Sequence, residues 1–306
     1  MLNREKAERM LDAPSFAECA KLLTDCGYED MSDKSADLID RTLNRYREEI
    51  FRPLQLQKPA SDLVDLFRVK YDYHNAKVML KAEATGSEAL PVMSASGRVA
   101  PEMLLSLYQE DRTHELPERL AKALAEGKEI LARTANPQLA DFALDRAYFE
   151  ELRSLSAEKG GFVRGYVSLL ADSTNLKSAV RTARMGKTAD FLRLALVPGG
   201  KVDPDRFAAA GEALPALFNG SVLAEAANLG AAAAEGGSMT AFERACDNAV
   251  TSYLRGAKLV SFGEETVLAY LAAVETEITA VRMILTGKLA GIAPQTIRER
   301  LRDLYA

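Results

Sequence analysis

Apolar residues recur every three or four positions along nearly the whole chain. In the segment 36–50 this spacing places Leu38, Ile39, Leu43 and Ile50 on one side of a helix, with charged residues between them. Residues 106–133 show the same period and are predicted to form helices interrupted near Pro117. No segment between the predicted turns alternates apolar and polar residues with the period of two that is typical of a β-strand. The pattern therefore predicts an all-α fold.

Two loops stand out from the helical pattern. VPGGKVDP (197–204) holds two glycines and two prolines, which disfavour helix. EGGSM (235–239) is the second loop, and its Ser238 is placed to cap a helix that starts near Thr240.

One helical motif is written three times, as NAKVMLKAEATG (75–86), NLKSAVRTARMG (175–186) and AVRMILTGKLAG (280–291). An acidic residue stands three positions before each copy, and a glycine able to end a helix closes each. Apolar residues at i, i+3 and i+4 indicate one buried stripe per copy. Ser87, Thr188 and Pro294 then suit the first turn of a further helix. The corresponding polar and glycine positions are Asp72, Asn75, Lys77 and Gly86; Asp172, Asn175, Lys177 and Gly186; and Glu277, Arg282 and Gly291, with Ala280 in the place of the amide.

A helix motif of this kind can recur by chance, but three copies about one hundred residues apart favour an internal repeat. The copies predict three similar helical subdomains, 1–97, 98–199 and 200–306. The repeated acid, amide and base are interpreted as partly buried structural residues that tie neighbouring helices together.

Composition narrows the function classes. The 306 residues are 48% hydrophobic and carry 39 basic against 44 acidic side chains, a net charge of −5, so no global charge favours nucleic acid or anionic lipid. The longest uncharged stretch, 213–224, contains Pro215 and Gly220 and is too short to span a membrane. The N-terminus has no secretory apolar core, and three cysteines suit a reducing, cytoplasmic setting.

Catalytic and cofactor motifs are not supported. Gly186, Lys187 and Thr188 match the tail of a phosphate-binding loop, but Arg181 stands where that loop requires glycine. His74 and His114 have no second ligand at metal-binding spacing. DFALD (141–145) places two carboxylates on one helix face, which favours either a divalent cation or, more commonly, a solvated surface. The sequence therefore predicts no catalytic residue, cofactor or metal.

Basic residues are concentrated between positions 161 and 200, where only Asp172 and Asp190 oppose them. Two interpretations remain open, a solvated helix surface or a docking surface for an acidic partner. The candidate contact surface comprises Arg181, Arg184, Lys187 and Arg193.

Several stretches resemble the C subunit of the bacterial and archaeal V/A-type rotary ATPases, the relative of the d subunit of eukaryotic V-ATPases. They occur in the family's order: LFRVKYDYHNAKVMLKAEATG (66–86), LADFALDRAYFEEL (139–152), LVPGGKVD (196–203), ERACDNAVTSYLRGAKLVSFG (243–263) and LTGKLAGIAPQTIRERLRDLY (285–305). The resemblance implies three helical subdomains arranged as a funnel around a pseudo-threefold axis.

The resemblance also implies a function. Such a subunit is a non-catalytic part of the central stalk, cytoplasmic and peripheral to the membrane, and it links the central shaft subunits to the membrane rotor ring so that ATP turnover is coupled to proton or sodium transport. The chain departs from the family pattern at Glu264 and Thr266, where prolines are usual. The family also has a further helix upstream of MLNREKAERMLDAPSF, so we expect either a shortened first subdomain or a trimmed N-terminus. The alternative is a helical scaffold or adaptor unrelated to ion transport, although such scaffolds usually repeat every 20 to 50 residues.

Overall fold

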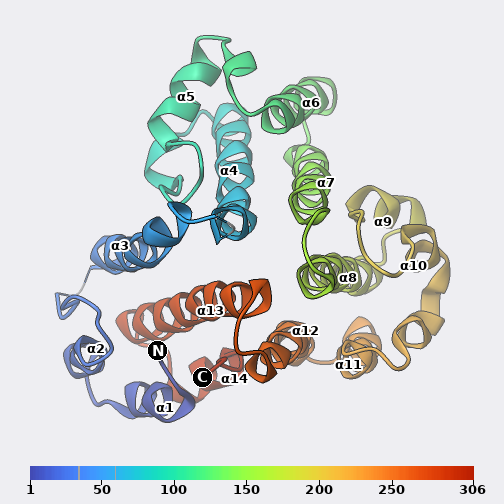
Figure 1. Cartoon of the computed structure of the whole chain (residues 1–306). Coiled ribbons are helices and arrows are strands. Elements are labelled where there is room, and N and C mark those ends of the chain that lie inside the picture. Colours follow the sequence, from blue (N-terminus) through green and yellow to red (C-terminus); the bar gives the residue numbers. More distant parts are fainter. Residues whose placement is uncertain (34, 59) are drawn as a thin grey trace. The chain divides into compact units, whose positions relative to one another are not determined.

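The computed structural model describes residues 1–33, 35–58 and 60–306, apart from the side chain of residue 212. All regular secondary structure in these residues is helical, which confirms the predicted fold class (Figure 1). Within the same residues no helix combines the length and the apolarity needed to cross a membrane. The chain forms two compact units, residues 1–61 with 218–306 (unit 1) and residues 62–217 (unit 2). The predicted division at 97 and 199 remains a prediction.

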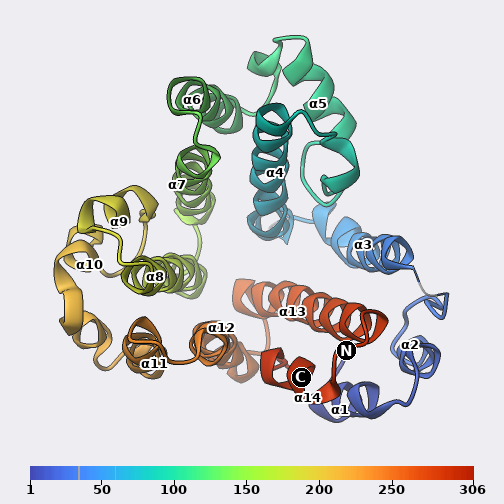
Figure 2. The same ribbon diagram turned by 180° about the vertical axis from the view of Figure 1, so that it is seen from behind.

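Unit 1 joins the two ends of the chain, and its helices α3 and α13 pack against one another. Phe51 of α3 is fully buried in this core. Figures 1 and 2 both show the beginning of the chain beside α13. The helices of this unit are α1 (Arg4–Asp12), α2 (Phe16–Thr24), α3 (Ala36–Gln55), α11 (Ala224–Ala234), α12 (Met239–Arg255), η4 (Gly256–Leu259), α13 (Glu264–Leu289) and α14 (Pro294–Arg300).

Unit 2 has its most extensive helix packing between α6 and α7, which are antiparallel neighbours joined by a short connection. Leu124 and Leu144 are buried there. Its elements are α4 (Ala60–Thr85), η1 (Leu90–Val92), α5 (Pro101–Gln109), η2 (Thr113–Glu115), α6 (Glu118–Thr134), α7 (Pro137–Ser156), α8 (Gly161–Arg184), α9 (Ala189–Ala195), α10 (Pro204–Ala210) and η3 (Gly211–Phe218), whose first and last elements extend into the chain of unit 1.

Helix ends follow the predicted signals with one exception. Ser238 accepts a hydrogen bond from the N–H of Ala241 and caps α12, Thr188 caps α9, and Pro294 opens α14. Ser87 opens no helix, because the chain first runs to Leu90, where only the short 3₁₀ turn η1 begins.

The three long helices that carry the repeated motif, α4, α8 and α13, are buried more widely than one stripe. In α13 the consecutive residues 271–275 are all buried, so the helix is enclosed on every side there. The predicted single stripe was therefore too narrow. The stretch LAAVETEI (271–278) includes two buried glutamates, Glu275 and Glu277, so the spacing of apolar residues alone underestimates how much of this helix is buried.

Candidate functional site

The repeated acid of each long helix is buried and accepts backbone N–H groups. In α4, Oδ1 of Asp72 accepts from the N–H groups of Arg98 (2.8 Å) and Val99 (3.1 Å). In α8, the two carboxylate oxygens of Asp172 accept from Lys201 (3.0 Å) and Val202 (3.1 Å). Charge-assisted bonds of this kind are stronger than neutral ones, so Asp72 fixes the segment before α5 and Asp172 fixes the segment before α10.

The copy in α4 also contains a buried ionic network. The guanidinium of Arg98 donates to Asp72 (2.7 Å) and contacts Glu151 of α7 (2.8 Å), whose other oxygen accepts from the hydroxyl of Tyr73 (2.8 Å). Burial raises the pKa of Asp72 above its ordinary value, and the charge of Arg98 opposes that shift. Two carboxylates therefore share one guanidinium, an arrangement that fixes geometry more than it adds stability.

Asp172 has no arginine partner among these contacts. Burial again raises its pKa, and the bonds from the N–H groups of Val202 and Lys201 act in the opposite direction. At Asp172, backbone N–H groups oppose the increase in pKa that burial causes. At Asp72, backbone N–H groups and the guanidinium of Arg98 oppose it together.

The third acid, Glu277 of α13, accepts from residues far away in the chain. Its Oε2 accepts the N–H of Leu2 (2.7 Å), and its Oε1 accepts the hydroxyls of Tyr28 (2.8 Å) and Tyr46 (3.3 Å). The two tyrosine rings are stacked, with centroids 4.1 Å apart. Burial and the neighbouring carboxylate of Glu277 raise the pKa of Tyr28, which stays a hydrogen-bond donor.

The repeated amide makes a two-bond clamp on the backbone. Asn75 exchanges both bonds with Ser94, at 2.9 and 2.7 Å, and Asn175 does the same with Val197, at 2.9 and 2.8 Å. From the sequence we expected these amides to tie neighbouring helices together. In the structure they bond the backbone of the loops at Ser94 and Val197.

Alanine replaces the amide in the third copy, and the chain after α14 is held differently. Arg302 pairs with Asp247 of α12 (2.8 Å), and the N–H of Asp303 donates to the side chain of Asn248 (2.9 Å). Because α12 holds this tail, an amide at position 280 has no loop to bind.

The repeated base lies between helices in two copies. Lys77 pairs with Asp145 of α7, and Arg282 pairs with Asp40 of α3 (2.7 Å). Lys177 is half-buried on α8. Asp141, the other carboxylate of DFALD, pairs with Lys81 (2.7 Å), so both carboxylates of that segment have lysine partners. The described residues hold no cluster of three or more metal-ligating side chains.

The three closing glycines share one backbone conformation. Gly86, Gly186 and Gly291 have φ of +68°, +62° and +68°, in the left-handed region. The N–H of the following residue bonds the carbonyl five positions earlier in each copy, for example Lys187 to Thr182 at 3.1 Å. Each long helix therefore ends in the same glycine motif.

The candidate basic residues lie at the end of α8 and on α9. Arg181, Arg184, Lys187 and Arg193 are all exposed. Arg193 pairs with Asp190 (2.6 Å), and the ammonium of Lys187 lies 5.9 Å from the ring centre of Phe191. The structure therefore brings these four residues to one end of the long helix, with at least one charge partly neutralised.

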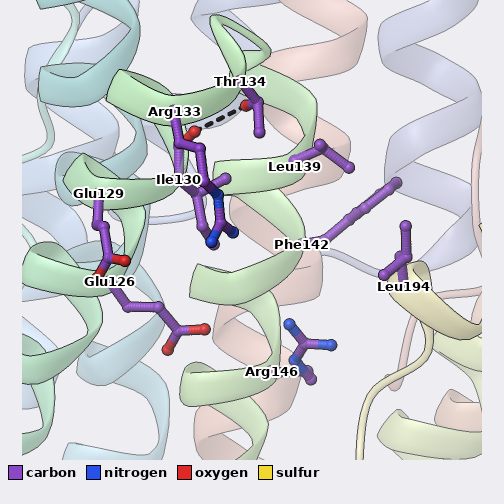
Figure 3. Close-up of a pocket in the computed structure, with 9 residues that line it drawn as sticks. All are labelled: Glu126, Glu129, Ile130, Arg133, Thr134, Leu139, Phe142, Arg146 and Leu194. Atoms are coloured by element: carbon purple, nitrogen blue, oxygen red, sulfur yellow. Dashed lines mark hydrogen bonds between the residues drawn. The ribbon is translucent and has the colours of Figure 1, made fainter.

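A groove of about 290 Å³ lies near this end, between α6, α7 and α9. Figure 3 shows Glu126 and Glu129 on one side of it and Phe142 and Leu194 on the other. Of the described residues that line it, none is a histidine or a cysteine. The groove combines an apolar wall with charges of both signs.

Several residues of these contacts carry no sequence signal of their own. Glu151 looks like an ordinary helix-surface residue, Tyr28 lies outside the helical pattern, and Leu2 lies in a segment that the repeat did not include. Tyr46 lies on the apolar side of the helix predicted over 36–50, but that spacing does not identify Glu277 as its partner. An alignment of the three copies that also included the segments before α5 and α10 would have identified Val99 and Val202 as equivalent positions.

Comparisons with known proteins show the family to which the chain belongs. The family model described as ATP synthase (C/AC39) subunit matches residues 1–300. The C subunit of the V-type sodium ATPase of Enterococcus hirae is 24% identical over 314 residues, which cover 100% of this chain and 94% of that protein. The C subunit of the A-type ATP synthase of Methanocaldococcus jannaschii is 25% identical, covering 98% of this chain and 82% of that protein. The C subunit of the V-type ATP synthase of Thermus thermophilus is 27% identical over 209 residues, covering 63% of this chain and 62% of that protein.

The chain therefore belongs to the ATP synthase (C/AC39) subunit family, as the resemblance found in its sequence indicated.

Proposed function

We propose that this chain is a non-catalytic subunit of a V/A-type rotary ATPase. It acts in the central stalk as a socket between the central shaft subunits and the membrane rotor ring, so that ATP turnover is coupled to proton or sodium transport. Its place is cytoplasmic and peripheral to the membrane. The observation that carries the proposal is the family match over residues 1–300.

The buried hydrogen bonds and the helix packing of this chain support a role as a subunit that transmits force. Asp72 and Asp172 each fix a loop through buried backbone bonds, and each glycine motif ends a long helix in the same way. Such contacts resist deformation because a buried donor or acceptor that loses its partner is costly, about 1–3 kcal/mol. Close-packed helices add stiffness for the same reason.

The test of the proposal is reconstitution. The folded chain is mixed with the shaft subunits and the detergent-solubilised rotor ring of the same source, and complexes are analysed by size and composition. We expect one stable complex in which this chain bridges shaft and ring. A folded, helical chain that binds neither partner would overturn the proposal.

The basic residues at the end of α8 are the proposed contact surface. Arg181, Arg184, Lys187 and Arg193 are exposed, and an acidic partner surface would attract them. Changing all four to glutamate should weaken the association with the partner complex at least tenfold at low salt, and the difference should shrink as salt screens the charges. The matched control changes four exposed basic residues elsewhere in unit 2 to glutamate, Arg112, Arg119, Lys122 and Lys128. Equal effects of the two variants would remove this surface from the proposal.

A further inference from the structure

One face of α7 lines the groove between α6, α7 and α9. Leu139, Phe142 and Arg146 lie on this face, and Figure 3 shows them in that order along the helix. Their spacing of i, i+3 and i+7 keeps them on one side of a helix, over a length of about 10 Å. All three side chains are half-buried, so the neighbouring helices leave this face of α7 partly uncovered.

The apolar wall of the groove is supported from behind. The ring of Phe142 packs edge-on against Phe191 of α9, with centroids 5.7 Å apart. Leu194 of α9 lies opposite Phe142 in Figure 3 and is 44% exposed. Because both side chains are fixed and partly exposed, a partner that covers them gains from the burial of apolar surface.

The charged side chains of the groove have no ion-pair partner among the described residues. Within residues 1–33, 35–58 and 60–306, no group forms an ion pair or a hydrogen bond with the side chains of Glu126, Glu129, Arg133 and Arg146. On another face of α7, by contrast, both aspartates of DFALD pair with lysines of α4. The half-buried guanidinium of Arg146 is therefore available to a carboxylate from outside the chain, which would form a charge-assisted bond with it.

The groove is continuous with the proposed contact surface at the end of α8. The ammonium of Lys187 lies 5.9 Å from the ring centre of Phe191, and the same ring packs against Phe142. Arg193 directly precedes Leu194 on α9, and both are exposed. Basic side chains therefore border the apolar wall on α7 and on α9, which favours an acidic partner.

We propose that the groove between α6, α7 and α9 binds an acidic amphipathic helix of another subunit, and this inference rests on the proposed function. Two apolar residues one turn apart on that helix cover Leu139 and Phe142, and an acidic residue one turn further pairs with Arg146. Glu126 and Glu129 on the α6 side accept a basic residue of the same helix, and they repel the anionic surface of a membrane.

Photo-cross-linking on the full chain identifies the occupant of the groove. p-Benzoylphenylalanine is placed at position 194, and the folded chain is mixed with the shaft subunits and the detergent-solubilised rotor ring of the same source. We expect mass spectrometry to find a cross-linked peptide of one of these subunits that carries two apolar residues and an acidic residue at helical spacing. Position 103 on α5 is the matched control, since Met103 is 53% exposed and lies outside the groove, and it should not cross-link to that peptide.

Other occupants give different cross-links. Cross-links to a second copy of this chain would identify a contact between copies, and cross-links to lipid or detergent alone would identify a membrane contact. Either result would overturn the proposal, and so would a bound chain that gives no cross-link from position 194.

Charge reversal tests the contact with Arg146. Arg146→Glu should weaken the association with the shaft and ring at least tenfold at low salt, with no change in melting temperature, because no described residue pairs with this side chain. Leu194→Asp should weaken the association to a similar extent, and the matched control Met103→Asp should not. Changing the acidic residue of the cross-linked peptide to lysine should restore binding to the Arg146→Glu chain.

The binding measurements separate this inference from the proposed function. If the parent chain binds and both groove variants bind equally well, only the groove proposal is overturned. If the parent chain binds neither shaft nor ring, the proposed function is overturned together with it. If Arg146→Glu does not fold, Leu194→Asp decides alone, since its position on the short helix α9 is exposed.

Discussion

Oδ1 of Asp172 occupies the space that a side chain on Gly200 would need. A Cβ built on Gly200 lies 2.2 Å from that oxygen, and a Cβ on Gly97 lies 2.5 Å from Oδ1 of Asp72. The acids can reach the backbone N–H groups beyond these glycines only because no side chain intervenes. The second glycine of VPGGKVDP is therefore required for close approach of the chain to the acid.

Gly200→Ala should lower the free energy of unfolding by about 1–3 kcal/mol, because either the loop or the acid must move. Denaturant unfolding measures the change. Gly161→Ala is the control, since a Cβ there meets no atom within 4 Å. Equal effects of the two substitutions would contradict the close approach.

Leu285→Ala should cost about 2–5 kcal/mol, since the side chain is fully buried on α13 and its removal leaves a cavity. Thermal or denaturant unfolding measures the loss. Leu259 is 91% exposed at the end of η4, so Leu259→Ala should change stability by no more than about 0.5 kcal/mol. A folded Leu285→Ala protein with the parent's melting temperature would show that the placement of α13 is wrong.

Asn175→Ala should destabilise the protein by about 2–4 kcal/mol, because it removes two bonds and leaves the buried N–H and carbonyl of Val197 without partners. The reverse change in the third copy, Ala280→Asn, should bring no gain in stability, since α12 already holds the tail at Arg302 and Asp303. A stabilised Ala280→Asn protein would mean that the backbone of the tail after α14 can bond the side-chain amide at position 280.

Cysteine reactivity should follow burial. Burial raises the pKa of the Cys19 thiol to about 11, whereas Cys26 is only half-buried. At pH 8 an alkylating reagent should therefore modify Cys26 first, and the buried Cys19 and Cys246 only on unfolding. Mass spectrometry of the labelled peptides gives the order, and early labelling of Cys19 would contradict its burial.

The same shift makes stability depend on pH. The folded pKa of Cys19 lies above its ordinary value of 9.0, so the folded state retains the proton more strongly. The resulting stabilisation is complete below pH 9 and is lost as pH rises toward 11. The difference in unfolding free energy between the parent and Cys19→Ala should fall over that interval, and a constant difference would contradict the shift.

Much of the architecture could be predicted from the sequence because helix signals are local. The period of apolar residues, the cap at Ser238 and the three closing glycines depend on residues within a few turns of one another. The fold class and the family follow from such features.

The partners of the repeated polar residues could not be predicted, because they depend on long-range placement. Nothing in the spacing of Asp72 or Asn75 distinguishes a bond to a loop backbone from a bond to a neighbouring helix. Leu2 and Glu277 show the limit most clearly, since a contact across 275 positions has no local signature. The width of burial around α13 was missed for the same reason.

The acids hold the segments opposite them through main-chain N–H groups, and a main-chain donor is the same for nineteen of the twenty amino acids. Position 201 can therefore accept side chains of almost any size or charge without loss of its bond to Asp172, and only proline, which has no N–H, is excluded. Homologous chains are free to vary their side chains at such positions while the paths of their loops stay fixed. A surface can in this way be adapted to a new partner without rebuilding the core beneath it.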